Sequence, residues 1–146
     1  MAVAGGRAGS GEAAEPFEMR VELGKVREFA RATNSRHHEY QQDEGVSPVT
    51  FLQTSAFWQT RANDPLPDRN MRRSLHAEQE FVFHGPPPGA GTRLIGAARI
   101  DKVYEKQSRR GTLTFVELVT EYRDEAGALV AESRLTGVEM PETPGE

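Results

Sequence analysis

The sequence predicts an α+β fold in which a curved antiparallel sheet wraps around one long, central, apolar helix. The first observation behind this prediction is a series of four strand-like segments between residues 74 and 140, separated by turn residues. The second is one strongly apolar segment, VTFLQTSAFW (49–58), which is apolar on most sides of a helix. The apolar helix and one face of the strands both have to be buried, and a sheet curved around the helix is the simplest arrangement that buries them together.

Length and composition indicate one folded domain with two short tails. The chain has 146 residues, of which 27% are charged and 36% hydrophobic, as is usual for a globular protein of one domain. The ends, 1–15 and 141–146, are rich in Gly, Ala, Pro and Glu and hold few residues that could join a core. We therefore expect disordered tails at 1–15 and 141–146, and a folded domain at 16–140.

The composition also argues against several classes of partner and cofactor. The net charge is −4, and the 15 arginines are scattered among acids, so nucleic acid is not a predicted partner. No apolar run is long enough to span a membrane, and the first residues lack the apolar core of a signal sequence, so we expect a cytoplasmic protein without membrane contact. The absence of cysteine removes disulfides, thiolate nucleophiles and cysteine metal sites.

The first third of the chain contains a strand, a helix and a polar loop. PFEMRVEL (16–23) alternates apolar and polar residues, which is typical of a half-buried strand. Val26, Phe29 and Ala30 then recur at helical spacing and predict a short amphipathic helix from about 24 to 33. A polar loop, 34–47, leads to the apolar helix.

We expect the apolar helix to begin at Ser47-Pro48 and to be buried. A serine side chain can accept hydrogen bonds from the free N–H groups of a first turn, and proline suits the first helical position.

The remaining chain predicts four strands joined by turns. The runs LHAEQEFVFHG (75–85), TRLIGAARIDKVYEK (92–106), GTLTFVELVTEYRDE (111–125) and ALVAESRLTGVEM (128–140) are separated by GPPPGAG, QSRRG and RDEAG. GPPPGAG is a stiff turn and not a phosphate loop, because no helix follows it. Gly127 is expected to take a positive φ in a tight hairpin turn.

Two histidines accompany the first of these strands. His76 and His84 are eight residues apart, so alternation places them on one outer face, with Leu75, Phe81 and Phe83 on the other. A partner contact or a pocket rim is the functional alternative for this histidine pair.

Four segments in order resemble one protein family. GKVREFARAT (24–33), SPVTF (47–51), LHAEQEFVFHGPPPGAGTRL (75–94) and GTLTFVELVTEYRDEAGALVAESRLT (111–136) are similar to the MaoC-like (R)-specific enoyl-thioester hydratases and dehydratases, in particular their N-terminal FAS1-like dehydratase branch. The resemblance covers about 16–140 and implies a single hot-dog fold. It also implies an acyl-CoA or acyl-carrier-protein thioester as ligand and a second MaoC-like hot-dog chain as partner. No cofactor is implied, because the thioester itself acidifies the α-carbon.

The segment FARATNSRHHEY (29–40) departs from the family in its chemistry. Active members carry a loop GDxNPxH after the first helix, whose Asp and His position water and move protons, while a backbone N–H at the start of the buried helix stabilises the enolate oxygen. Aligned without a gap, Ser35 stands at the Asp position and Tyr40 at the His position. Neither side chain titrates near neutral pH. The resemblance therefore implies a hydratase subunit that lacks the catalytic pair and holds the acyl chain for a partner.

Other interpretations of this loop stay open. A shift of one or two residues would bring His37 or His38 into the catalytic place, with Asp43 or Glu44 as the acid. The chain would then be an autonomous homodimeric hydratase. A hot-dog thioesterase and a non-catalytic acyl-CoA-binding homodimer are further alternatives. The two histidines can equally form a solvated pair, and adjacent histidines splay apart, so no metal site is predicted.

The resemblance also suggests which residues contact the ligand. It places Phe51, Phe57 and Trp58 beside the acyl chain, although the same residues would serve as ordinary core. Arg109-Arg110, at a turn, would either contact a phosphate of CoA or of a carrier protein, or lie in solvent.

Overall fold

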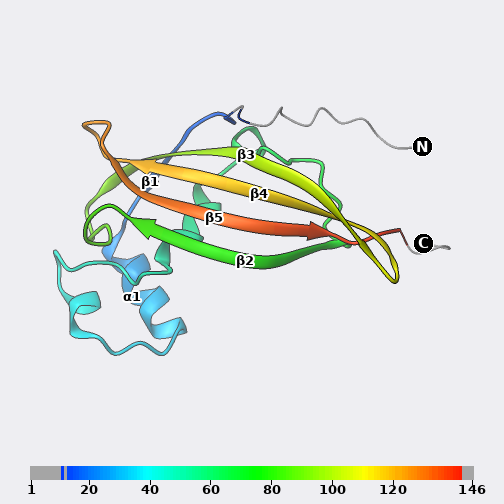
Figure 1. The fold of residues 1–146 in the computed structure, drawn as a ribbon. Helices are drawn as coiled ribbons and strands as arrows, with labels where there is room; N and C mark the ends of the chain where they lie inside the picture. The colour runs from blue at the N-terminus through cyan, green and yellow to red at the C-terminus, as the bar shows by residue number, and fades with distance from the viewer. Residues whose placement is uncertain (1–10, 12, 143–146) are drawn as a thin grey trace.

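Five segments with alternating apolar side chains form one antiparallel sheet in the order β1-β3-β4-β5-β2 (Figure 1). The computed structural model describes residues 11 and 13–142. Its strands are β1 (Phe17–Arg20), β2 (Ser74–Phe83), β3 (Arg93–Ser108), β4 (Gly111–Arg123) and β5 (Leu129–Glu139). This is the predicted α+β hot-dog fold, but the central helix is a 3₁₀ helix of eight residues and not a long helix.

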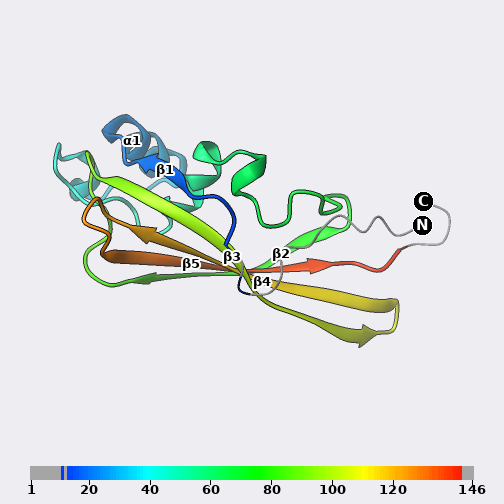
Figure 2. The ribbon, with the colours of Figure 1, turned by 90° about the horizontal axis from the view of Figure 1, so that it is seen from above.

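The helices lie on one face of the sheet and cover one end of it (Figure 2). They are α1 (Leu23–Ala32) and three 3₁₀ helices, η1 (His38–Gln41), η2 (Phe51–Trp58) and η3 (Arg61–Asn63). The first helix lies within one residue of its predicted bounds, and it buries Val26 and Ala30 as its spacing indicates.

The central apolar segment differs from its prediction in where it starts. η2 begins at Phe51 and not at Ser47. The segment before it is extended, because Val46 bridges to Gly89 and the Ser47 N–H donates to the Pro88 carbonyl at 3.0 Å. The segment before η2 is thus held against the turn at 85–91, and the first helical residue lies four positions after Ser47.

The central segment also differs in what it buries. In a 3₁₀ helix every third residue faces the same way. Leu52 and Ser55 are buried on the side that faces the sheet, and Trp58 is half-buried. Phe51 is also fully buried, whereas Phe57, near the end of the segment, is 78% exposed.

The core lies between η2, α1 and the covered end of the sheet. Phe51 is fully buried and meets Phe29 edge-on, with ring centroids 5.6 Å apart. Phe17 packs across Gly96, where a Cβ would stand 2.3 Å from the Phe17 ring. Around these residues are the other members of the buried cluster: Met19, Val21, Val26, Leu52, Leu94, Tyr122 and Ala131.

The β3–β4 hairpin runs past the helix layer (Figure 2). Burial in β3 alternates as far as Ile100, and from Asp101 to Ser108 every residue except Tyr104 is exposed. A register shift between Ile100 and Lys102 marks the change. In this outer part Tyr104 stacks on Phe115, with ring centroids 5.0 Å apart.

The two outer strands of the sheet are unequal. β1 has four residues, whereas β2 has ten, and β5 is the only described strand paired with β2. The His84 N–H donates to the Val130 carbonyl at 3.0 Å, so it points toward β5. Because the direction of the N–H groups alternates along a strand, those of Gln79 and Phe81 point toward the open edge. Such an edge is a template for pairing with another strand.

Most of the two predicted tails, namely residues 1–10, 12 and 143–146, lies outside the described residues. The inner end of the first tail is hydrogen-bonded to β3, in contrast to the expected disorder. The Gly11 N–H donates to the Ile100 carbonyl at 2.9 Å, and the Ala14 N–H donates to the Ala98 carbonyl at 2.8 Å.

Candidate functional site

The loop after α1 closes into a ring beside the helix. Asn34, with φ 55°, reverses the chain, and the Ser35 N–H donates to the Ala30 carbonyl at 2.8 Å. Arg27 holds the far side through Nη2, which donates to the Gln41 carbonyl at 2.8 Å and to Asp43 Oδ1 at 3.3 Å. The side chains of the ring are therefore placed relative to α1.

The ring is anchored to the proline-rich turn at 85–91. The Ala90 N–H donates to the Gly45 carbonyl at 3.2 Å. At Gly45 a Cβ would stand 1.8 Å from the Glu39 carbonyl oxygen, so this crossing of backbones requires glycine. The turn that the sequence predicts as a stiff connection thus also fixes the end of the loop.

The residues at the family's catalytic positions point in different directions. Tyr40 packs against the core cluster, and Ser35 is half-buried. His37 and His38 are exposed and stacked, with ring centroids 5.2 Å apart. In the described part of the chain it is therefore Tyr40, and neither histidine, that packs from this loop against the core cluster.

The acid beside the histidines is neither Asp43 nor Glu44, the two that the shifted alignments suggest. His38 Nε2 lies 2.7 Å from Glu39 Oε1, and the Glu39 N–H donates to His37 Nδ1 at 3.4 Å. Asp43 is bound to Arg27. The sequence does not indicate this contact, because adjacent residues in an extended loop point apart.

This histidine–carboxylate pair lies in solvent, and two N–H groups near the start of η2 are already hydrogen-bonded. The His38 side chain is 75% exposed, and water screens an exposed pair. At the start of η2, the Phe51 N–H donates to the Pro48 carbonyl at 2.8 Å, and the Gln53 N–H donates to the Thr50 carbonyl at 3.1 Å. These two N–H groups are satisfied within the chain and are not free to hold an enolate oxygen.

The three residues predicted to contact an acyl chain occupy different environments. Phe51 is buried in the core, and Trp58 packs half-buried against the core cluster. Phe57 is exposed, and the Lys25 ammonium lies 5.3 Å from its ring centroid. Phe51 is thus part of the core, Trp58 lies at the edge of the core, and Phe57 faces outward.

A buried polar contact connects the central helix to the sheet. The hydroxyls of Ser55 and Tyr122 are 2.9 Å apart and share a hydrogen bond. Burial raises the pKa of Tyr122 to about 12, and the hydrogen bond with Ser55 offsets this only in part. Tyr122 therefore stays protonated and does not serve as a proton-transfer group near neutral pH.

Replacing Tyr122 with phenylalanine should lower the free energy of unfolding by about 1–2 kcal/mol. The ring and its packing remain, but Ser55 loses a buried partner and keeps only Gln59, whose Nε2 is 3.4 Å away. Urea unfolding of the variant and the parent measures the difference. A variant as stable as the parent would show that the hydroxyl pair contributes nothing.

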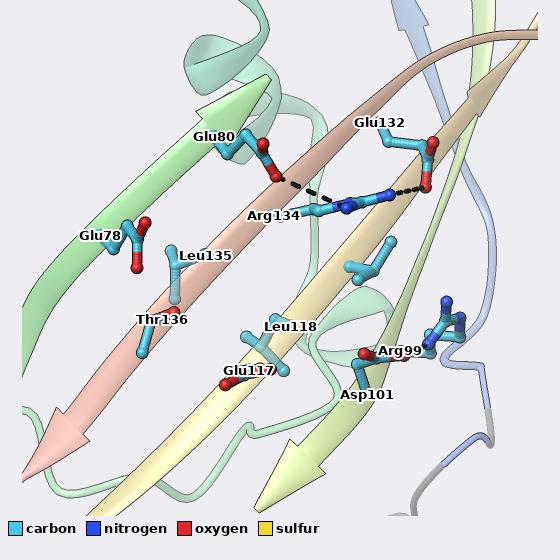
Figure 3. Close-up of a pocket in the computed structure, with 11 residues that line it drawn as sticks. Glu78, Glu80, Arg99, Asp101, Glu117, Leu118, Glu132, Arg134, Leu135 and Thr136 are labelled. Atoms are coloured by element: carbon cyan, nitrogen blue, oxygen red, sulfur yellow. Dashed lines mark hydrogen bonds and ion pairs between the residues drawn. The ribbon is translucent and has the colours of Figure 1, made fainter. Parts of the chain in front are cut away.

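The structure contains a shallow cavity of about 370 Å³ on the outer face of the sheet (Figure 3). Arg134 lies between Glu80 and Glu132, with N–O distances of 3.6 and 3.3 Å. Burial alone would raise the pKa of Glu132, but hydrogen bonds from His84 and Arg134 outweigh it and hold the pKa below its usual value. The charges here largely pair with one another, as on an ordinary solvated sheet face.

The predicted common face for His76 and His84 is wrong. A register shift between His76 and Glu78 inserts an extra residue in β2, so the two histidines fall on opposite faces. Leu75 consequently leaves the face of Phe81 and Phe83 and is 56% exposed.

A second cavity, of about 360 Å³, lies at the end of α1, inside the ring of the loop. It is lined by Arg27, Arg31, Asn34, Ser35, Arg36 and Gln41. In the described ranges, no three His, Asp or Glu side chains come together as metal ligands, and no helix is long and apolar enough to cross a membrane.

Comparison with known proteins places this fold and loop in context. A family model described as "FAS1-like, dehydratase domain region" matches residues 8–133. A chain of the HadBC (3R-hydroxyacyl-ACP dehydratase) complex from Mycobacterium tuberculosis is 27% identical, with a TM-score of 0.71 over 88% of this chain and 96% of that one. No curated protein matches the chain.

Two further solved structures share the fold at lower identity. A chain of the ChsH1-ChsH2 complex from Mycobacterium tuberculosis is 18% identical, with a TM-score of 0.70 over 90% of this chain and 87% of that one. A MaoC-like dehydratase is 22% identical, with a TM-score of 0.76 over 95% of this chain but only 45% of its own length. The present chain thus corresponds to about half of that larger protein.

Proposed function

The chain belongs to the FAS1-like dehydratase domain family, and from that membership we propose that it is the acyl-chain-holding subunit of an (R)-specific enoyl-thioester hydratase. In this proposal a second MaoC-like hot-dog chain carries the Asp and His that perform the chemistry. The complex would interconvert a trans-2-enoyl thioester of CoA or of an acyl carrier protein and its (R)-3-hydroxyacyl form.

The observation that carries the proposal is the position of Tyr40. At the family's histidine position the loop carries a tyrosine that packs half-buried against the core cluster, while its two histidines face solvent. A tyrosine side chain does not replace a histidine as a general base that activates water. The fold is thus kept while the acid and base at the two motif positions are absent.

The open edge of β2 supports a partnership with another chain. β2 has ten residues, and along its outer side the N–H and C=O groups of alternate residues pair with no described strand. Pairing with the same strand of a second hot-dog chain would continue the sheet and cover that edge. The similarity to a chain of the HadBC complex, at 27% identity, favours a partner of the same fold.

In the complex the chemistry would proceed without a cofactor. The partner's His and Asp would orient a water molecule and transfer its proton, so that hydroxide adds to C3 of the enoyl thioester and a proton to C2. This chain would supply apolar surface for the acyl tail from the half-buried region around Trp58. Phe57 is exposed, and the partner would cover it on assembly.

Enoyl-CoA hydration tests the proposal directly. The loss of absorbance of the conjugated thioester is followed with crotonyl-CoA and longer enoyl-CoAs, for this chain alone and for its mixture with a MaoC-like chain encoded beside it that carries the Asp–His loop. We expect no turnover by the chain alone and turnover by the mixture. Turnover by the chain alone would reject the proposal and favour the autonomous enzyme, for which the 2.7 Å His38–Glu39 contact is the supporting observation.

A further inference from the structure

The cavity at the end of α1 gathers three arginines and no acid in its lining. Arg27 and Arg31 are four residues apart and share one face of the helix. The reversal at Asn34 then returns the chain so that Arg36 lines the same cavity. Residues distant in the loop are thereby brought around one space.

Two of these guanidinium groups have no partner among the described residues. Asp43 pairs with Arg27, but no described residue forms a hydrogen bond or ion pair with the guanidinium of Arg31 or Arg36. Arg31 lies in the last turn of α1, where a cation is favoured by the helix dipole. That effect does not extend to Arg36, which lies beyond the helix.

The three positively charged guanidinium groups repel one another, and a bound anion would offset this repulsion. Like charges at i and i+4 on a helix disfavour one another, and Arg36 adds a third. A phosphate group accepts hydrogen bonds from several guanidinium groups at once and would reverse this repulsion. The volume of about 360 Å³ lies at the lower end of small-molecule sites, about 300–1,000 Å³, and has room for a phosphate and part of what carries it.

We propose that Arg27, Arg31 and Arg36 form a binding site for a phosphate group of the thioester's carrier. This inference rests on the proposed function, since the ligand it names is the phosphate of CoA or of a phosphopantetheine arm. The cavity adjoins the loop that carries the catalytic pair in active relatives, so a carrier held there would lie at the rim of the acyl site. Asn34 and Ser35 add neutral polar groups to the same lining.

The hairpin turn offers a matched control. Arg109 and Arg110 are likewise two exposed arginines, at the tip of the β3–β4 hairpin. The double variants Arg31→Gln/Arg36→Gln and Arg109→Gln/Arg110→Gln change the net charge equally. The comparison separates a local site from general attraction of anions, and it also tests the alternative that the hairpin arginines contact the phosphate.

The experiment is a titration followed by the amide and arginine Nε–H signals in two-dimensional NMR, with inorganic phosphate, 4′-phosphopantetheine and CoA as separate probes. We expect Arg31→Gln/Arg36→Gln to weaken CoA binding about tenfold, because each exposed charged contact contributes roughly a two- to fivefold effect. The hairpin variant should bind within about twofold of the parent, and raising the salt from about 50 to 200 mM should weaken binding to the parent. CoA should bind more tightly than 4′-phosphopantetheine if its additional phosphates are the ones held.

Each outcome decides the inference. Equal weakening in both double variants, loss only in the hairpin variant, or no phosphate binding by the parent would overturn it. The proposed function is tested separately by comparing CoA with a long-chain acyl-CoA. Arginine-dependent phosphate binding without any gain from the acyl chain would uphold the site and reject the acyl-holding role. A gain from the acyl chain without arginine dependence would do the reverse.

Discussion

Replacing both His37 and His38 with alanine should leave the hydration rate of the two-chain complex within about twofold of the parent, whereas removing the histidine of the partner's loop should lower it by about 10²–10⁴-fold, the usual contribution of a general acid or base. His37 and His38 are exposed, and Glu39 is their only acidic contact among the described residues. A pair in water contributes little to moving a proton at an enclosed substrate.

The same assay includes a control variant and a result that would contradict the prediction. Glu39→Gln removes the acid next to His38 and should be equally silent. A loss beyond about tenfold in the His37→Ala/His38→Ala variant, with kcat reduced and assembly intact, would make these histidines participants in proton transfer. The loop would then be a rearranged active site, and the chain would count as an enzyme on its own account.

Replacing Phe51 with alanine should lower the free energy of unfolding by about 3–5 kcal/mol, the usual cost of removing a large aromatic side chain from a core. Phe51 is fully buried and packs edge-on against Phe29. Its loss would leave a cavity between η2 and α1 that rigid neighbours cannot fill. Urea unfolding at several protein concentrations measures the change and separates it from any effect of self-association.

Phe57→Ala is the matched control, because it removes the same side chain from the same helix. Phe57 is 78% exposed, so its loss should change the unfolding free energy by no more than about 0.5 kcal/mol. A cost below about 1 kcal/mol for Phe51→Ala would mean that Phe51 borders empty space, as a residue lining an acyl tunnel would. The two phenylalanines therefore distinguish core from pocket within one short segment.

The predictable parts of this fold are those governed by local pattern. Val26 and Ala30 are buried as helical spacing requires, and the long strands follow from alternation between turn residues. Gly127 has φ 83°, as the tight hairpin turn demands. The sequence predicts a helix start at Ser47, but the helix starts at Phe51. The difference was not predictable, because the segment before Phe51 pairs with Pro88, which is distant in the sequence. The extra residue in β2 is equally invisible to a strict period of two.

The candidate site divides in the same way. Alignment with the family motif identifies Ser35 and Tyr40 from sequence alone, because it depends only on the order of residues. The Ser55–Tyr122 contact joins residues 67 positions apart and depends on strand register, which the sequence does not specify. The convergence of Arg36 on Arg27 and Arg31 depends on the reversal at Asn34. An asparagine at this position is compatible with a chain reversal but does not by itself predict one.

The outer part of the β3–β4 hairpin has a consequence for how the sheet opens. From Asp101 onward β3 is largely exposed, so this end of the two strands relies on backbone hydrogen bonds, the Tyr104–Phe115 stack and the lysines over these two rings. Strand ends with few buried contacts open at a small fraction of the free energy that unfolds the core. The end covered by η2 is therefore expected to open less readily than the outer end, which can open without unfolding the core.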